Sequence, residues 1–198
     1  MTIDIEGCEM DAAHVFFTGD HHFRQAVTDA RAHDRDEGMD ERRIARWNEK
    51  VGPEDVVFYV GDFCDGDAHN PLAWMIDVGE TRRRLNGRIF LVKGNHDRLS
   101  NADYRQAGFE EVYDRPILLD DLIIVSHSPQ EWFDQLPSGV KAVYGHVHDA
   151  AGYPDATGNT FCCCVERTGD APASLKEIVE RMEAASAAES GKQDGGLA

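Results

Sequence analysis

Short runs of hydrophobic residues, separated by longer polar stretches, set the pattern of this chain. Runs at 15–18, 56–60 and 88–92 predict buried strands, and shorter ones predict strands at 122–125, 142–144 and 161–165. Stretches of mixed polarity predict helices at 24–50, 72–85 and 174–184. The first helix is interrupted near Gly38, with Asp40 as the cap of its second half, and Ser174 caps the last. Strands that alternate with helices predict an α/β fold.

The organisation along the chain predicts one domain with a short segment at each end. A length of 198 residues fits a single domain with a core of useful size. Residues 1–13 are polar and predict an N-terminal extension, either loose or forming an edge strand. Residues 14–184 hold every predicted strand and helix and form the domain itself. Residues 185–198 are rich in Ala, Ser and Gly and predict a disordered tail.

Residues that can bind a metal follow five of the predicted strands, usually beside a glycine. They are Asp20 and His22, Asp62, Asn95, His127, and His146 with His148. In α/β proteins ligands gather where strands end at one edge of a sheet, so we expect these side chains to converge. Glycine at a strand end lets the backbone turn sharply and come close to a bound group.

The chemistry of this set indicates divalent cations. Carboxylate, imidazole and amide groups without thiolates suit hard or borderline ions, with manganese as the first candidate and iron or zinc as alternatives. Two cations about 3.5–4 Å apart can bind both the attacking and the leaving oxygen of a phosphate. Seven protein ligands are about what two such ions need, so the pattern predicts a two-metal centre.

The net charge of the chain narrows the classes of partner that we expect. The net charge is −17, from 37 acidic and 20 basic residues, and such a surface repels nucleic acid and favours a small substrate. Either a salt-adapted source or an ordinary acidic cytosolic protein explains this charge. No apolar run approaches the roughly 20 residues of a membrane span. The first ten residues carry acids instead of the basic and apolar regions of a signal peptide, so we expect a cytoplasmic protein without membrane contacts.

The cysteines do not change this interpretation. There are five of them, an odd number without an export signal, so no disulfide framework is expected. Cys162, Cys163 and Cys164 lie on a predicted strand, where successive side chains point to opposite faces. We therefore interpret them as small buried strand residues and not as zinc ligands.

Taken in order, the strand-end segments resemble the signature of the calcineurin-like metallophosphoesterase family. The resemblance runs from about residue 15 to 178 and is nearest to the small single-domain phosphoesterases. The segments that carry it are Gly19-Asp20-His21-His22, Gly61-Asp62, Gly94-Asn95-His96-Asp97, Ser126-His127 and Gly145-His146-Val147-His148. It implies a four-layer sandwich of two mixed β-sheets flanked by helices.

The resemblance also implies a role for each site residue. The first metal would be bound by Asp20, His22 and His148, the second by Asn95, His127 and His146, and Asp62 would bridge them. A hydroxide shared by the metals would attack a phosphomonoester or phosphodiester of a small phosphorylated or nucleotide substrate. His96 would protonate the leaving oxygen, and Asp97 would hold its ring. His supplies a pKa suited to such an acid.

Some features leave alternatives open. Arg98 is either a clamp for a phosphate oxygen or part of a surface ion pair. Arg24-Gln25 stands where relatives often carry Gly-His, so substrate contacts there differ. His21 and Trp74 are interpreted as packing residues, and the Arg82–Arg84 run as a solvated helix face. The alternative functions are a nuclease, which needs a basic track, and a non-catalytic metal-binding scaffold.

Overall fold

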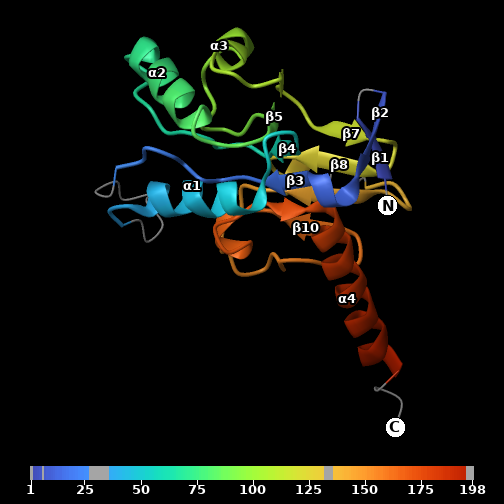
Figure 1. Ribbon diagram of the computed structural model, residues 1–198. Coiled ribbons are helices and arrows are strands. Elements are labelled where there is room, and N and C mark those ends of the chain that lie inside the picture. The colour runs from blue at the N-terminus through green and yellow to red at the C-terminus, as the bar shows by residue number, and fades with distance from the viewer. Residues whose placement is uncertain (1, 6, 27–35, 132–135, 195–198) are drawn as a thin grey trace.

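Two mixed β-sheets form the centre of the computed structural model, which describes residues 2–5, 7–26, 36–131 and 136–194 (Figure 1). The five-stranded sheet has the order β11-β3-β4-β5-β6: β11 (Ala173–Ser174), β3 (Val15–Thr18), β4 (Val56–Tyr59), β5 (Arg88–Val92) and β6 (Glu111–Tyr113). Only β11 is antiparallel to its neighbour in this sheet. The four-stranded sheet has the order β10-β9-β8-β7: β10 (Thr160–Cys162), β9 (Lys141–Tyr144), β8 (Ile123–Ser126) and the antiparallel β7 (Ile117–Leu119).

Helices flank these sheets. The outer face of the five-stranded sheet is covered by α1 (Met39–Lys50), α2 (Pro71–Arg82) and α3 (Asn101–Gln106). Helix α4 (Leu175–Asp194) packs into the core between the sheets through Ile178 and Met182, and its far end extends away from the body (Figure 1). The described residues also form three short 3₁₀ turns: η1 (Ala12–His14), η2 (Pro129–Glu131) and η3 (Val165–Arg167). The predicted arrangement of two mixed sheets flanked by helices is confirmed.

The central strands are buried on both faces, which explains why they read as continuous apolar runs. Phe17, Phe58 and Phe90 point into the core between the sheets. Their neighbours Phe16 and Tyr59 point to the helices. Each predicted strand is present, although the last ends at Cys162 instead of residue 165, because the chain enters the 3₁₀ turn η3.

The start of the first helix differs from the sequence expectation. Residues 24–26 and 36–38 are not helical, and 27–35 lie outside the described residues. Gly38, with φ of 86°, precedes α1, and Asp40 lies in the first turn instead of capping it. Its carboxylate accepts a hydrogen bond from the Arg24 backbone N–H at 2.9 Å. Asp40 therefore fastens the preceding segment to the helix.

Both ends of the chain are more ordered than their composition indicates. The hairpin of β1 (Thr2–Ile5) and β2 (Cys8–Asp11) buries Ile3, which is only 1% exposed, in the core between the sheets. Helix α4 continues to Asp194, so residues 185–194 are helical and not a disordered tail, while 195–198 lie outside the described residues. Alanine and glutamate are strong helix formers, and this propensity outweighs the isolated serines and glycine. Among the described residues every helix is too short or too polar to cross a membrane.

Trp47 of α1 is the largest fully buried side chain among the described residues, so its removal tests the packing of the core. Its side chain is fully buried and its indole N–H donates to the Asn86 carbonyl at 2.9 Å. We expect Trp47→Ala to lower the free energy of unfolding by about 3–5 kcal/mol, because it leaves a cavity under α1. Urea denaturation measures this, and Leu72→Ala, at a residue 63% exposed on α2, is the control that should stay within about 0.5 kcal/mol of wild type.

Candidate metal centre

The predicted site residues follow the carboxyl ends of parallel strands in both sheets. Asp20, Asp62 and Asn95 come after β3, β4 and β5, and His127 and His146 come after β8 and β9. Backbone hydrogen bonds join the two sheets at this end: the Gly19 N–H donates to the Cys163 carbonyl at 3.1 Å, and the Val165 N–H donates to the Gly19 carbonyl at 3.1 Å. The loops of both sheets therefore open onto one place.

There the side chains form three adjoining groups of metal-binding atoms, of which the third, His22, Asp65 and His96, shares His22 with the first. In the first, one atom each of Asp20, His22 and His148 lies within 4.8 Å of the others. In the second the same holds for Asp62, His127 and His146. The Asn95 Oδ1 is 3.1 Å from the His127 Nε2, which adds the amide to the second group.

Asp62 lies between the first two groups. Its Oδ2 is 3.6 Å from the Nε2 of His22 and 3.4 Å from the Nε2 of His127. The structure thus brings together all seven residues that the sequence predicts as ligands. A carboxylate shared by two cations would occupy a position of this kind.

The backbone at this site is strained. Five of the seven residues have left-handed φ angles: Asp20 at 62°, His22 at 45°, Asp62 at 57°, His146 at 72° and His148 at 46°. Such conformations cost of order 1–3 kcal/mol each and persist only where the surroundings hold them. Here the His22 N–H donates to the Asp62 carbonyl at 3.1 Å, and the His146 N–H donates to the Asp20 carboxylate at 3.0 Å.

Two glycines let the carboxylates lie against the backbone. A Cβ at Gly94 would overlap the Asp62 carboxylate, and a Cβ at Gly145 would overlap that of Asp20. Both positions therefore require glycine for a close approach, as their places at strand ends predict.

Burial and charge fit a cation. Asp20 and Asp62 are 1% and 2% exposed, and among the described residues no Lys or Arg lies within ion-pair distance of either. Burial raises the pKa of Asp20. It also opposes ionisation of Asp62, but hydrogen bonding to His127 and the charges of His127 and His22 outweigh it and hold the pKa of Asp62 at about 2. Buried carboxylates without Lys or Arg partners need positive charge, which protonated imidazoles can supply and which divalent cations would supply to this oxygen and nitrogen set.

Three of the site histidines have raised pKa values. Burial lowers the pKa of His127, but hydrogen bonding to Asp62 and the charges of Asp20 and Asp62 outweigh it and raise the pKa to about 10. The pKa values of His22 and His148 are also raised: burial opposes the charged form, but hydrogen bonds to Asp65 and Glu166 and neighbouring carboxylates outweigh it.

Three of the histidine rings have a hydrogen-bond partner at Nδ1, which leaves Nε2 to face the centre of the site. The Nδ1 of His22 is 3.0 Å from Asp65, the Nδ1 of His148 is 3.1 Å from Glu166, and the Nδ1 of His127 is 2.9 Å from the Val60 carbonyl. Partners of this kind fix the tautomer and orientation of metal-binding imidazoles.

The predicted role of Asp97 as the support of the His96 ring is not the one the structure shows. Asp97 is 4% exposed and accepts hydrogen bonds from the backbone N–H groups of Asp62, Phe63 and Gly94 and from the Tyr104 hydroxyl. Neighbours in the chain point apart here, so Asp97 holds the Asp62 and Gly94 loops together instead. The carboxylate beside His96 is Asp65, 3.4 Å from its Nδ1.

Asp65 and Glu166 are the residues that the sequence analysis missed. Asp65 follows Asp62 by three positions, within the same strand-end loop, and Glu166 comes just after β10, which is parallel to β9. The signal was available in both cases, because each is an acid at the carboxyl end of a strand that belongs to the same set.

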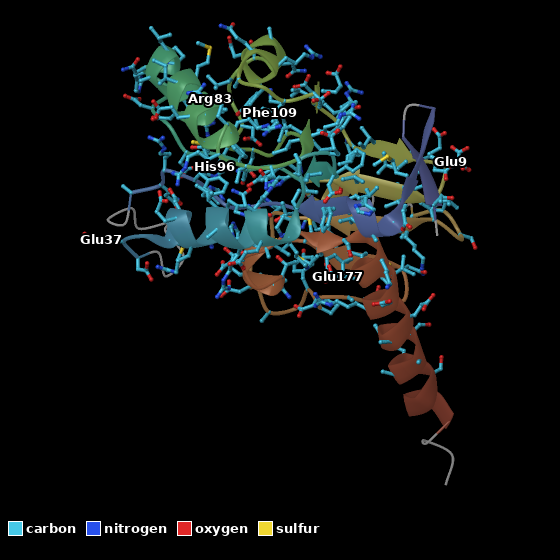
Figure 2. The ribbon with its side chains drawn as sticks, viewed as in Figure 1. Glu9, Glu37, Arg83, His96, Phe109 and Glu177 are labelled. Atoms are coloured by element: carbon cyan, nitrogen blue, oxygen red, sulfur yellow. The ribbon has the colours of Figure 1, made fainter. Side chains whose placement is uncertain are left out.

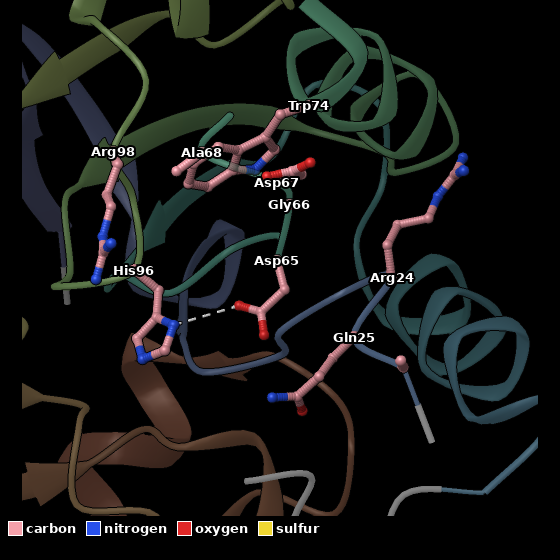
Figure 3. A pocket seen from close by; sticks show the side chains of 10 residues that line it. Arg24, Gln25, Asp65, Gly66, Asp67, Ala68, Trp74, His96 and Arg98 are labelled. Atoms are coloured by element: carbon pink, nitrogen blue, oxygen red, sulfur yellow. Dashed lines mark ion pairs between the residues drawn. The ribbon is translucent and has the colours of Figure 1, made fainter. Parts of the chain in front are cut away.

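A cavity of about 350 Å³ opens beside His96. Figure 3 shows Asp65, His96 and Arg98 along it, with the guanidinium of Arg98 extending toward the His96 side. Arg24 also lines it, but its guanidinium is bound at 2.9 Å to both Asp77 and Glu80. The residues that line the cavity come from the loops after β3, β4 and β5 and from α2; His96, labelled in Figure 2, belongs to the loop after β5.

The residues predicted to pack are buried. His21 is buried, with its ring stacked on Phe23 at 4.7 Å, and Trp74 is 4% exposed. Cys162, Cys163 and Cys164 are buried.

Comparison with known proteins places the chain. It is 37% identical over 101 residues to the Gene 66 protein of Mycobacterium phage D29, an alignment that covers 48% of this chain and 45% of the phage protein, so the chain matches less than half of that relative's length. Its fold is similar to that of the protein of unknown function AQ665 from Aquifex aeolicus, with a TM-score of 0.59, 22% identity, and coverage of 85% of this chain and 98% of that one. A weaker likeness, with a TM-score of 0.45, 21% identity and coverage of 75% and 73%, is to the Pseudomonas putida nuclease MPE.

A model of one family matches most of the sequence. The calcineurin-like phosphoesterase model spans residues 13–166, and this range contains every residue of all three metal-binding groups. The chain belongs to the calcineurin-like phosphoesterase family.

Proposed function

We propose that this protein hydrolyses phosphate esters with a pair of divalent cations and acts on small phosphorylated or nucleotide substrates. The observation that carries the proposal is the Asp62 carboxylate between two groups of ligand atoms, 3.6 Å from His22 and 3.4 Å from His127. Membership of a phosphoesterase family supports the reaction type.

The residues divide between the cations as follows. The first would be bound by Asp20, His22 and His148, the second by Asn95, His127 and His146, with Asp62 shared. When bound, such a pair polarises the phosphate and lowers the pKa of water. We propose manganese as the native metal, with iron and zinc compatible with the same donors.

The other residues orient the substrate and move a proton. His96 is fixed through its backbone N–H, which donates to Asp62 at 2.8 Å, and its side chain is 25% exposed toward the cavity. Asp65 at Nδ1 leaves the Nε2 to face the substrate, where it gives its proton to the departing oxygen. Among the described residues Arg98 has no ion pair, so it is available to bind a phosphate oxygen.

The distribution of arginines favours a small substrate over a nucleic acid. Arg24 is paired with acids, Arg84 is paired with Glu41, and Arg82 donates to the carbonyls of Gly87 and two other residues. Arg83 lies at a different hollow, between α2 and α3. These side chains do not form the continuous basic track that a nuclease uses.

The proposed function predicts that turnover depends on bound metal. Protein loaded with Mn²⁺ should hydrolyse an aryl phosphate or its diester, and excess chelator should abolish the activity. Mn²⁺ at about 100 times its Kd should stabilise the fold by about 2.7 kcal/mol, seen as a higher Tm. Asp62→Asn should lower kcat at least about a hundredfold in the same assay. A wild-type protein that binds two Mn²⁺ ions and turns over neither ester would favour the scaffold function instead.

His96 has a selective effect in this scheme. We expect His96→Ala to lower kcat by about 10²–10⁴ for alkyl esters, whose leaving oxygen needs a proton. An activated aryl phosphate should lose much less, because its leaving group departs as a stable anion. Kinetics on a series of esters with graded leaving-group pKa measure the difference. Equal losses across the series would contradict the role as an acid.

Metal uptake should release protons. The pKa of about 10 keeps the His127 ring protonated near neutral pH, and the raised pKa values of His22 and His148 favour their protonated forms, whereas ligand nitrogens must be neutral. Apparent Mn²⁺ affinity should therefore fall as the pH falls from 8 toward 6. Calorimetry in buffers of different ionisation enthalpy should show net proton release at about pH 7.5. A binding enthalpy that is independent of the buffer would refute this prediction.

A further inference from the structure

Two consecutive residues of η3, Glu166 and Arg167, contact His148 at its ring and at its backbone. The Glu166 carboxylate is 3.1 Å from the ring Nδ1, and the guanidinium of Arg167 donates to the His148 backbone carbonyl. Arg167 also donates to the carbonyls of Tyr153 at 2.7 Å and Ala150 at 3.0 Å. The loop that carries His148 is thereby fastened to the turn that follows β10.

Glu166 is in turn connected to a buried arginine of α1. Arg43 is 4% exposed, and its Nη2 lies 3.8 Å from the same Glu166 oxygen that faces His148. Its Nε donates to Asp170 at 3.1 Å. A buried guanidinium of this kind is retained only where its charge and its N–H groups are met.

Arg43 reaches the first ligand group by a second route. Its Nη1 donates at 2.8 Å to the carbonyl of His21, the residue between Asp20 and His22. One side chain thus holds the peptide that joins two ligands and the carboxylate behind the third. All three ligands of the first group are connected to α1 through Arg43.

Among the described residues, the imidazoles of the second group have no carboxylate at their Nδ1 atoms. The Nδ1 of His127 faces the Val60 carbonyl, and the Nδ1 of His146 faces the Nε2 of His127 at 3.1 Å. Asp65 supports His22 in the first group, but it also lies beside His96, so a change there would affect two functions. Glu166 is the carboxylate whose role can be tested separately.

We propose that Arg43 and Glu166 are positioning residues for the first metal: they fix the His148 ring with its Nε2 toward Asp20, and their loss weakens one of the two cation sites selectively. The inference rests on the proposed two-metal function, but its test measures binding and not turnover. Partners behind metal-binding histidines affect metal affinity by about 10–100-fold.

The experiment titrates the metal-free protein with Mn²⁺, using calorimetry and the electron paramagnetic resonance signal of the free ion. In Glu166→Gln, which keeps the length of the side chain and removes its charge, we expect one binding event to weaken about 10–100-fold and the other to stay unchanged. Arg43→Lys, which keeps the charge but cannot reach all three partners, should weaken the same event. Glu177→Gln is the matched control, because Glu177 pairs with Lys50 at 2.8 Å and contacts no ligand; its titration should equal that of wild type.

Two results would overturn the proposal. One is unchanged binding of both ions by Glu166→Gln. The other is an equal loss at both sites together with a lower Tm of the metal-free protein, which indicates general damage. If Glu166→Gln does not fold, Glu166→Asp tests the same point, because it withdraws the carboxylate by one methylene group. Wild-type protein that binds two ions without hydrolysing any ester would count against the proposed function only, since the titrations of the variants are compared without substrate.

Discussion

The burial of two carboxylates that, within the described part of the chain, have no Lys or Arg partner is the constraint on which this structure depends. Asp20 and Asp62 lie where the two sheets meet, at 1% and 2% exposure, and an unpaired charge in such a place is strongly unfavourable. The surroundings meet it with imidazoles and with backbone N–H groups that donate to both carboxylates. What these groups leave uncompensated is the charge that divalent cations supply when they bind.

The site also depends on the presence of two sheets, because its residues come from loops of both. A single sheet edge would present the loops after β3, β4 and β5, and these hold only Asp20, His22, Asp62 and Asn95 among the ligands. The remaining imidazoles arrive from β8 and β9 of the other sheet. Hydrogen bonds between Gly19 and the segment after β10, together with the packed core between the sheets, fix the distance between the two sheet edges. This distance sets the spacing of the candidate ligands.

Much of this could be predicted from the sequence, because apolar runs that end in Gly-Asp or Gly-His show both the strand and its edge. All seven candidate ligand positions follow from that pattern and from the family resemblance. The residues around them were harder to identify. The places of Asp65 and Glu166 after strands were a weak signal, because acids are common in this chain: 37 of its 198 residues are Asp or Glu. Asp97 was misassigned because adjacency in sequence does not set the direction of a side chain. The extent of α4 was missed because an alanine-rich segment reads as a tail unless helix propensity is weighed first.

The left-handed backbone at His22, His146 and His148 has a consequence for how such a centre can diverge. A glycine or asparagine would occupy these positions with less strain than histidine. Stability of the polypeptide alone therefore gives no reason to keep imidazoles there, and a lineage released from its need for metal would drift toward those smaller residues while its sheets stayed intact. The fold itself thus gives no reason for histidines at these left-handed positions, whereas a metal-binding role would give one.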